Sequence, residues 1–391
     1  MKCELVLHRT PDYHSSIRNR PRGLPNWIEG AMHNYRKCSS RLACTGARVL
    51  LASACLLVLA GCGAEGPRPN VVLITVDTLR SDILAPYSVA ASPGNAVGRA
   101  VVDVANTPHL SELASSATLF ERATAPMSLT RPSHFSIFTG RYPREHGVVN
   151  NQIALRAAEE TVTELFRDEG YHTGAFVAVS LLGEGSGALQ GFDTVAGPSN
   201  QLEWAAPRVI DHARKWLQSL PEDEPYFLWV HLFDPHQPYN PPAQERVGLD
   251  AELAADYPSI GWGELLEIAK ANGGHISQEV LDYSKALYRA EVQAVDASVG
   301  LLIETVDSLA APERTMVVFT ADHGECFENG NYFEHSDCLY EGGVRVPLIV
   351  RYPAEFAAGE RVSSLVSNGD IAPTLLRAAG ISVPTTMTSL A

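Results

Sequence analysis

The sequence has little positive charge. It contains 30 Lys and Arg residues against 45 Asp and Glu residues, which gives a net charge of −15 at pH 7. Nucleic-acid binding needs a basic face, so this composition argues against a nucleic-acid partner. An acidic surface favours solubility and does not attract anionic polymers. An anionic substrate would therefore need a local positive site, which a metal ion can supply.

The sequence also lacks internal repeats, low-complexity tracts and a membrane-spanning apolar run. The apolar run at residues 49–60 has about 12 residues, whereas a spanning helix needs about 20. The absence of repeats and biased tracts argues against a repeat or disordered architecture. With 45% hydrophobic and 19% charged residues, the chain is typical of a globular protein with one large domain or two ordinary ones.

The run at 49–60 has the length of a signal-peptide core. Basic residues precede it, and Leu59-Ala60-Gly61-Cys62 follows it. This order resembles the bacterial lipobox, in which the Cys is lipidated and becomes the mature N-terminus. The alternative is a buried helix that ends in Gly-Cys. The basic residues are Arg36, Lys37, Arg41 and Arg48.

We therefore expect residues 1–61 to form a signal-peptide region. Met32 is a natural start for such a signal, so residues 1–31 are expected to be an upstream extension. The lipid on Cys62 would attach the protein to a membrane of the bacterial cell envelope. The Gly/Pro-rich residues 62–69 would then form a tether.

Cysteine is scarce beyond this region. Of seven Cys residues, four precede Cys62, and Cys326 and Cys338 follow it. An envelope location permits a disulfide between these two, and two buried free thiols are the alternative. Nine of the basic and three of the acidic residues also lie in 1–61, so the rest of the chain has 21 basic and 42 acidic residues.

Strand and helix patterns alternate after residue 69. Continuous apolar, β-branched runs predict buried parallel strands at 70–77, 226–234 and 315–322, and weaker strands are predicted at 174–179 and 344–351. Helices are predicted at 107–114, 203–219, 281–309 and 371–379. This alternation predicts an α/β fold with a central, mostly parallel sheet and helices on both faces. Residues 237–280 are loop-rich and are predicted to be an insertion near the site.

Each of the three strong strands ends in an acidic residue, namely Asp77, Asp234 and Asp322. Ligands of open α/β sheets bind at the carboxyl ends of the strands. Three carboxylates there would repel one another unless a cation lay among them. His236 and His323 follow two of these strands. Any single one of the Asp residues could equally be a turn or a helix cap.

A second candidate feature is Thr130 in the segment 126–140. Pro132 suits the first turn of a helix, and apolar residues follow it. Thr130 would then lie at the helix N-terminus, where an anion or an alkoxide is stabilised. The alternative is that Thr130 only caps the helix.

Five segments in this order resemble the sulfatase family of the alkaline-phosphatase superfamily. The resemblance covers residues 69–385 and implies an alkaline-phosphatase-like α/β fold, metal dependence and sulfuric ester hydrolysis. It predicts a catalytic domain at 70–385 whose small C-terminal subdomain is truncated. The segments are Asn70 to Arg80, Thr130-x-Pro132-Ser133-His134 to Val148, Asp234-Pro-His236-x-Pro-Tyr, Thr320-Ala-Asp322-His323-Gly324-Glu325, and Leu339-Tyr340-Glu341-x3-Arg345.

The sequence departs from the usual sulfatase pattern. Sulfatases carry Cys or Ser in a Cys-x-Pro-x-Arg pattern that is converted to formylglycine, but here Thr130 and His134 occupy the Cys and Arg positions. The usual Asp-Asp pair is Asp77-Thr78, and no Lys-x-His follows Gly170-Tyr171. Formylglycine is therefore not expected.

A local resemblance to phosphoethanolamine transferases concerns four histidines. It includes the segment from His323 to His335 and the pair His231 and His236. This resemblance implies that His236 and His335 bind a second metal or the anionic oxygens of the substrate, with His231 as a weaker candidate. The alternative is that these histidines only support or cap other residues.

The hypothesis for the site is a divalent metal bound by Asp77, Asp322, His323 and the Thr130 hydroxyl. Two carboxylates and an imidazole favour Zn or Mn, with Ca possible. Thr130 attacks phosphorus or sulfur, and His236 or His335 protonates the leaving oxygen. His134 contacts the anion or orients Thr130, and Ser133 caps the helix.

Three functions remain open at this point. The first is hydrolysis of sulfate or phosphate esters through Thr130. The second is a phosphodiesterase or phosphoethanolamine-type transferase that acts on envelope glycans or lipids. The third is a non-catalytic glycan-binding surface protein. The expected partners are an anionic ester, as part of a glycan, lipid or small molecule, and the membrane.

Overall fold

The computed structural model describes residues 68–88, 103–200, 203–327 and 333–390. The predicted signal region, the lipid site at Cys62 and most of the tether lie outside the described residues. The chain divides into two units, and the second, Gly66–Ala391, contains every described residue. Among the described residues, no helix is both long and apolar enough to cross a membrane.

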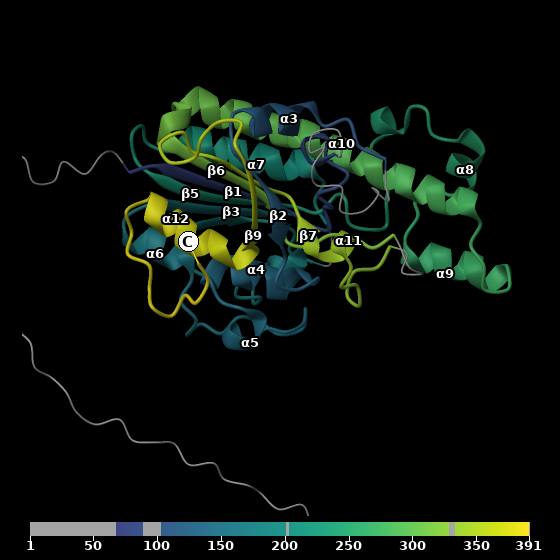
Figure 1. Ribbon diagram of the computed structural model, residues 1–391, viewed down its shortest axis with the longest axis horizontal. Helices are drawn as coiled ribbons and strands as arrows, with labels where there is room; N and C mark the ends of the chain where they lie inside the picture. The colour runs from purple at the N-terminus through teal and green to yellow at the C-terminus, as the bar shows by residue number, and fades with distance from the viewer. Residues whose placement is uncertain (1–67, 89–102, 201–202, 328–332, 391) are drawn as a thin grey trace, which may run out of the picture. The chain divides into compact units, whose positions relative to one another are not determined.

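A nine-stranded sheet forms the centre of this second unit (Figure 1). The three strong predicted strands are adjacent and parallel, with β1 (Asn70–Val76) between β5 (Tyr226–Leu232) and β6 (Thr315–Ala321). Every residue of these three strands is buried, as their apolar runs predict. β3 (His172–Val177) and β4 (Thr194–Ala196) continue the parallel half of the sheet.

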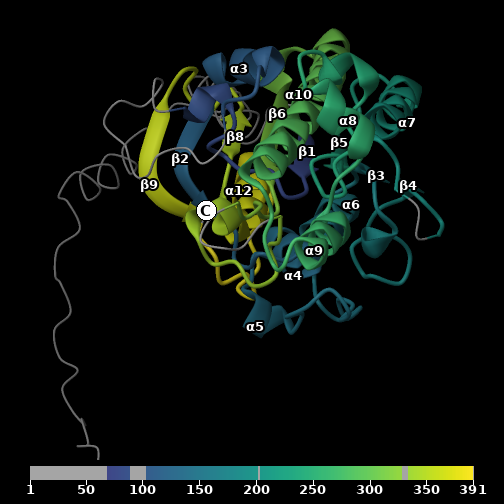
Figure 2. The same cartoon turned by 90° about the vertical axis from the view of Figure 1, so that its right-hand side faces the viewer.

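The other half of the sheet is partly antiparallel. β8 (Leu348–Arg351) runs antiparallel to β6 and to β2 (Thr118–Thr124). The predicted strand 344–351 is divided at Pro347, which has no N–H to donate, so β7 (Arg345–Val346) is separate from β8. β9 (Arg361–Ser367) lies beside β2 in Figure 1 and Figure 2. Because β2 and β9 carry many polar residues, the sequence pattern did not predict them.

Helices cover both faces of the sheet, as predicted (Figure 1). α3 (Pro108–Ser115), α7 (Ala206–Ser219) and α10 (Gln278–Leu309) form one layer. α4 (Thr130–Thr139), α6 (Val162–Asp168) and α12 (Ile371–Ala378) form the other. The fold is therefore a three-layer α/β arrangement.

The predicted insertion contains two short helices, α8 (Ala251–Asp256) and α9 (Trp262–Ala271). They lie beyond one end of the sheet, next to α10 (Figure 1). The insertion is close to the predicted site, because Pro238, Asn240 and Pro242, which precede α8, and Ser259, which lies between α8 and α9, line the same cavity as His236.

The register of the central strands brings the predicted site residues together. Val76 of β1 pairs with Ala321 of β6, so Asp77 and Asp322, the next residues, leave the sheet side by side. On the other side of β1, Thr75 pairs with His231 of β5. The carboxyl ends of all three strands therefore meet at one edge.

Candidate active site and metal centre

Asp77, Asp322 and His323 form a buried cluster of possible metal ligands. One ligand atom from each lies within 4.8 Å of the others, and all three residues are fully buried. His323 Nε2 lies 3.6 Å from Asp77 Oδ1 and 3.4 Å from Asp322 Oδ2. Two ligands that each stand ~2.1 Å from one ion lie about 3.0–3.6 Å apart. The spacing therefore fits ligands of a single cation.

The facing atoms of this cluster have no other partner. Both carboxylate oxygens of Asp77, Oδ2 of Asp322 and Nε2 of His323 are buried without a hydrogen bond among the described residues. Buried polar atoms are nearly always satisfied, and each exception calls for an explanation. A divalent cation bound by these four atoms explains all of them at once.

The electrostatics of the cluster lead to the same conclusion. Burial alone would raise the pKa of Asp77, but the close approach of His231 at 3.6 Å and the charges of His323 and His236 hold this pKa below its usual range. Burial and the adjacent charge of Asp77 raise the pKa of Asp322 well above its usual range. Two buried carboxylates at this separation cannot both ionise without a positive partner.

His323 is held in the form that binds metals. Burial, together with the charge of His335, lowers the pKa of His323 to about 3. The imidazole is therefore neutral at physiological pH, as metal coordination requires. Its other nitrogen, Nδ1, lies 3.0 Å from the carbonyl oxygen of Gly324, which assigns the hydrogen to Nδ1 and leaves Nε2 free to coordinate.

A strained turn after β1 positions Asp77. Thr78 has a φ of +52°, a left-handed conformation that a β-branched residue rarely adopts. The turn is stabilised by Tyr288, whose hydroxyl donates to the Thr78 carbonyl oxygen at 2.8 Å. The backbone N–H of Thr78 also donates to the Asp322 carboxylate. The turn thus joins the ends of β1 and β6.

Thr130 lies at the start of α4, as predicted. It is the first residue of the helix, is 2% exposed, and follows Leu129, which makes no side-chain cap. His134, one turn later, has Nδ1 2.8 Å from the Thr130 carbonyl oxygen and 3.5 Å from Asp322 Oδ2. The same histidine nitrogen therefore contacts both the predicted nucleophile residue and a predicted metal ligand.

The position of His134 distinguishes between its two predicted roles. Its second nitrogen, Nε2, lies 3.1 Å from the Thr75 hydroxyl. Both ring nitrogens therefore have protein partners, which favours orienting Thr130 over contacting an anion. Burial and the charge of His231 lower the pKa of His134 to about 3, so the ring is neutral.

The predicted capping role of Ser133 is wrong. Ser133 is the fourth residue of α4, and its hydroxyl donates to the backbone carbonyl of Asp322 at 2.6 Å. The first-turn hydroxyl is directed toward the sheet rather than back to the helix N–H groups. Ser133 therefore joins α4 to the residue that follows β6.

For Asp234, the structure favours the alternative of a turn or helix cap. Both of its carboxylate oxygens accept from the backbone N–H of Ala206, at 3.0 and 2.9 Å, at the first residue of α7. Asp234 thus satisfies a helix N-terminus, which is the ordinary function of an Asp in a turn. It does not belong to the cluster of Asp77, Asp322 and His323.

Three further histidines lie around the cluster. His335 has its ring centroid 4.6 Å from that of His323, and His236 follows at 5.2 Å from His335. His231 is fully buried, with Nε2 3.6 Å from Asp77 Oδ2 and both nitrogens unpaired among the described residues. The fold therefore brings all the predicted histidines to one place.

His335 differs from His323 in its charge. Burial would lower the pKa of His335, but the hydrogen bond and charge of Glu325 raise it to about 9. Its Nδ1 lies 3.3 Å from Glu325 Oε1, and Glu325 is fully buried. At neutral pH His335 therefore carries a proton beside the neutral His323.

A disulfide and the contacts of Arg80 fix the position of the segment that carries Glu325 and His335. A disulfide joins Cys326 to Cys338, so the structure supports the disulfide rather than free thiols. Arg80, which is 2% exposed, donates from Nη1 to the Glu325 carbonyl oxygen at 2.7 Å and packs over the ring of Phe327. Sequence reasoning gave Arg80 and Glu325 no role, although both lie in quoted segments.

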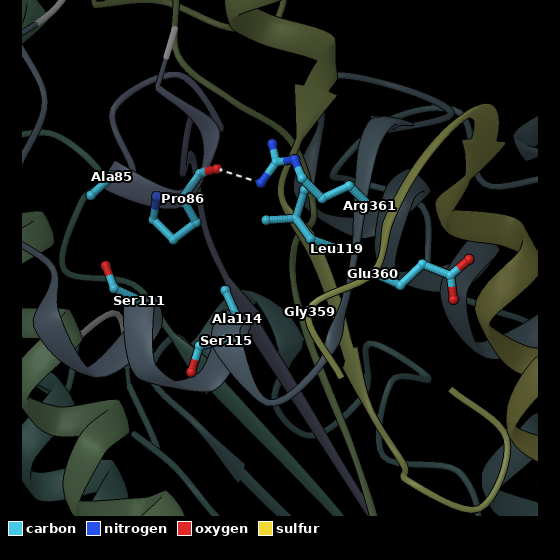
Figure 3. Close-up of a pocket in the computed structure, with 9 residues that line it drawn as sticks. All are labelled: Ala85, Pro86, Ser111, Ala114, Ser115, Leu119, Gly359, Glu360 and Arg361. Carbon is cyan, nitrogen blue, oxygen red and sulfur yellow. Dashed lines mark hydrogen bonds between the residues drawn. The ribbon is translucent and has the colours of Figure 1, made fainter. Parts of the chain in front are cut away.

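Two cavities differ in their relation to this cluster. One of about 380 Å³ is lined by His236, Asp234 and Glu291, among others. Another of about 350 Å³ lies between α3 and the start of β9, where Arg361 donates to the Pro86 carbonyl oxygen at 3.1 Å (Figure 3). None of the predicted site residues lines the second cavity, so the first is the candidate substrate cavity.

Comparison with known proteins identifies the family of this chain. The family model described as Sulfatase matches residues 69–381. The chain belongs to the sulfatase family. An ulvan-active sulfatase of Formosa agariphila is 25% identical over 356 residues, which cover 82% of this chain and 63% of the relative. The N-acetylglucosamine-6-O-sulfatase of Bacteroides thetaiotaomicron is 24% identical over 424 residues, which cover 86% and 73%.

A solved structure supports the sulfatase fold. The phosphonate monoester hydrolase from Silicibacter pomeroyi superposes with a TM-score of 0.64 at 20% identity, covering 83% of this chain and 76% of the other. The α/β architecture with a central sheet and flanking helices is thus shared with a protein that is named for hydrolysis of a phosphorus ester rather than a sulfate ester.

Proposed function

We propose that this sulfatase-family protein is a metal-dependent hydrolase of sulfate or phosphate esters with Thr130 as its nucleophile. The observation that carries the proposal is the buried, unpaired donor set of Asp77, Asp322 and His323. Thr130 is tied to this set because His134 Nδ1 contacts both its carbonyl and Asp322 Oδ2.

The donor set fits a divalent cation. Two carboxylates and one imidazole favour Zn or Mn, and Ca would more often have oxygen ligands alone. When bound, such an ion supplies a Lewis acid that polarises the ester oxygen and lowers the pKa of a coordinated hydroxyl. Asp77, Asp322 and His323 would hold it, with the Thr130 hydroxyl as a fourth candidate ligand.

Side chains of the protein would supply the nucleophile and the proton for the leaving oxygen. Thr130, at the N-terminus of α4, has the helix dipole behind it, which stabilises negative charge on its oxygen and on the bound anion. His335 carries a proton at neutral pH and can donate it to the leaving oxygen. His236, at a ring distance of 5.2 Å from His335, is the alternative proton donor.

The choice between sulfate and phosphate esters rests on the relatives and on Thr130. Two curated relatives are named as sulfatases, and one structural neighbour is named as a phosphonate monoester hydrolase. The chain has no Cys followed by x-Pro-x-Arg, so formylglycine is not expected at the site. A Thr nucleophile acts directly through its hydroxyl, which suits either ester.

Turnover of nitrophenyl sulfate, phosphate and phosphodiester by wild type, Thr130→Ala and Thr130→Ser tests the nucleophile. Loss of the hydroxyl should lower kcat at least about 1,000-fold, because no other hydroxyl takes its place. Thr130→Ser retains the hydroxyl and should keep much of the rate. The ester that turns over fastest in wild type identifies the reaction centre. Equal rates in wild type and Thr130→Ala would refute the assignment.

The competing glycan-binding function makes a different prediction. A non-catalytic surface protein need not retain a metal, so the metal content of the purified protein separates the two. Metal in wild type that is lost in Asp77→Asn supports the catalytic proposal. Absence of metal from wild type, with no turnover of any probe, would favour the binding protein.

We also propose that Cys62 carries a lipid that anchors the protein in the bacterial envelope. The support is the order of basic residues, apolar run and Leu-Ala-Gly-Cys at residues 36–62. Growth of an expressing bacterial strain with labelled palmitate should label wild type but not Cys62→Ala. A labelled Cys62→Ala protein, or an unlabelled wild type, would contradict the anchor.

A further inference from the structure

The cavity beside His236 has an unusual chemistry for a site that accepts an anionic ester. Its volume is about 380 Å³, and its lining includes Trp204, Phe233, Asp234, His236 and Glu291. His236 stacks on Phe233 at a ring distance of 4.2 Å and faces His335, which in turn faces His323. The cavity therefore adjoins the histidines of the active site.

Glu291 is the buried acid of this cavity. It is 5% exposed and lies on α10. Its Oε1 accepts from the backbone N–H of Asn240 at 2.7 Å, whereas no hydrogen bond to Oε2 is made within the described part of the chain. Oε2 is not among the fully buried unpaired atoms, so it is accessible to a ligand in the cavity that Glu291 lines.

The surroundings of Glu291 compensate its charge only in part. Burial and the charge of Asp234 outweigh the hydrogen bond from Asn240 and the charge of Arg246, and they raise the pKa of Glu291 to about 8. The carboxyl group is therefore mostly protonated at pH 7 in the empty cavity, and an ammonium group bound beside it would ionise it. The nearby guanidinium of Arg246 is directed elsewhere, with Nε on the Pro241 carbonyl oxygen at 2.8 Å and Nη2 on Asn240 Oδ1. Arg208 lies over the ring of Trp204 at 3.9 Å and does not line the cavity.

Asp234 and Glu203 add two further acids to the lining of this cavity. Both carboxylate oxygens of Asp234 hold the Ala206 N–H, and burial raises the pKa of Asp234 to about 6. Beside these three acids, the rings of Trp204 and Phe233 provide apolar surface, which suits the carbon skeleton of a cationic group.

We infer that this cavity is the subsite for an ammonium group on the alcohol part of the ester substrate, with Glu291 as its counter-ion. The anionic end of the ester would lie at the cluster of Asp77, Asp322 and His323, and the ammonium-bearing alcohol would extend past His335 and His236 to Glu291. This inference rests on the proposed function. Both an amino sugar and an amino alcohol carry the required group.

Matched pairs of substrates test this selectivity. Glucosamine 6-sulfate is compared with glucose 6-sulfate, and O-phosphoethanolamine with ethyl phosphate, at about pH 7. Wild type should favour the ammonium member of at least one pair by about 10-fold or more in kcat/KM, the range expected for a charged hydrogen bond. The favoured pair identifies the source as an amino sugar or an amino alcohol.

Two variants of α10 localise the effect. Glu291→Gln keeps the acceptor for Asn240 but removes the ionisable carboxyl group, so it should abolish the preference for the ammonium member of each pair. Glu304→Gln, which removes an exposed carboxylate from the same helix, should behave as wild type. Equal selectivity in Glu291→Gln and wild type would overturn the assignment.

Calorimetric binding of glucosamine against glucose, and of ethanolamine against ethanol, separates this inference from the proposed function. Tighter binding of an amine that depends on Glu291 supports the subsite even if no ester turns over. Turnover of nitrophenyl esters without any amine preference in binding or catalysis would overturn the subsite while the hydrolase proposal stands.

Discussion

At the scale of single residues, His134 links the strand that precedes Asp77 to the helix that begins at Thr130. A carbonyl oxygen can only accept, so His134 Nδ1 donates to Thr130 and Nε2 accepts from the Thr75 hydroxyl. Thr75 in turn accepts from Trp229 Nε1 at 2.9 Å. His134, Thr75 and Trp229 are fully buried, so this hydrogen-bond chain has no competing water contact. We assign His134 and Thr75 as positioning residues.

Thr75→Val tests this hydrogen-bond chain. The variant keeps the shape of the side chain but leaves His134 Nε2 and Trp229 Nε1 without a partner, which should cost about 1–3 kcal/mol of unfolding free energy. If the chain positions Thr130, kcat should fall with little change in KM, and Thr75→Ser should restore it. A loss of stability with an unchanged kcat would show that the chain is purely structural.

At the scale of elements, the turn after β6 depends on its contact with α11 (Glu341–Val344). Gly324 donates its N–H to the Gly343 carbonyl oxygen at 2.9 Å. A Cβ atom on Gly324 would lie 2.0 Å from the Gly342 carbonyl oxygen, which is backbone and cannot rotate away. The turn that carries Asp322, His323 and Glu325 therefore fits α11 only with glycine at position 324.

Gly324→Ala should separate this turn from α11 and displace the ligands on both sides of it. We expect reduced metal content, at least about 10-fold lower activity and roughly 1–3 kcal/mol lower stability. Gly263→Ala in α9 is the matched control, because its Cβ has nothing within 4 Å and alanine favours a helix. Normal metal content in Gly324→Ala would contradict the proposed coupling.

At the scale of the whole catalytic unit, the central sheet brings two buried carboxylates to one edge. β1 and β6 pair in parallel over their full lengths, so Asp77 and Asp322 cannot move apart without breaking the sheet. Repulsion between these two carboxylates therefore lowers the stability of the folded state unless a cation offsets it.

Removal of the cation by a chelator should lower the stability of the folded state. EDTA treatment should lower the midpoint of thermal unfolding by several degrees, because a ligand at about 100 times its Kd stabilises by roughly 2.7 kcal/mol. Zn or Mn should restore the midpoint. Asp77→Asn, which removes one ligand charge, should be insensitive to EDTA. An unchanged midpoint in wild type, with metal removed, would contradict a stabilising cation.

The sequence by itself determined the central strands and the ligand cluster. Uninterrupted β-branched runs have few alternatives to a buried parallel strand, and an acid at the end of each such run must lie at the carboxyl edge. Asp77 and Asp322 were located in this way, with His323 next to Asp322, whereas Thr130 was located from the helix-start pattern around Pro132. The alternation of strands and helices predicted that helices cover both faces of the sheet.

Only the tertiary structure decided what depends on contacts between distant segments. It showed that Asp234 holds the start of α7, that Ser133 bonds to Asp322 and that His134 is fixed by Thr75. It also showed the acidic cavity around Glu291, a residue in the middle of α10 with no local signal. The reason is physical: a pattern along the chain reports burial and the end of a strand, whereas the partner of a polar atom depends on which other strand or helix packs beside it.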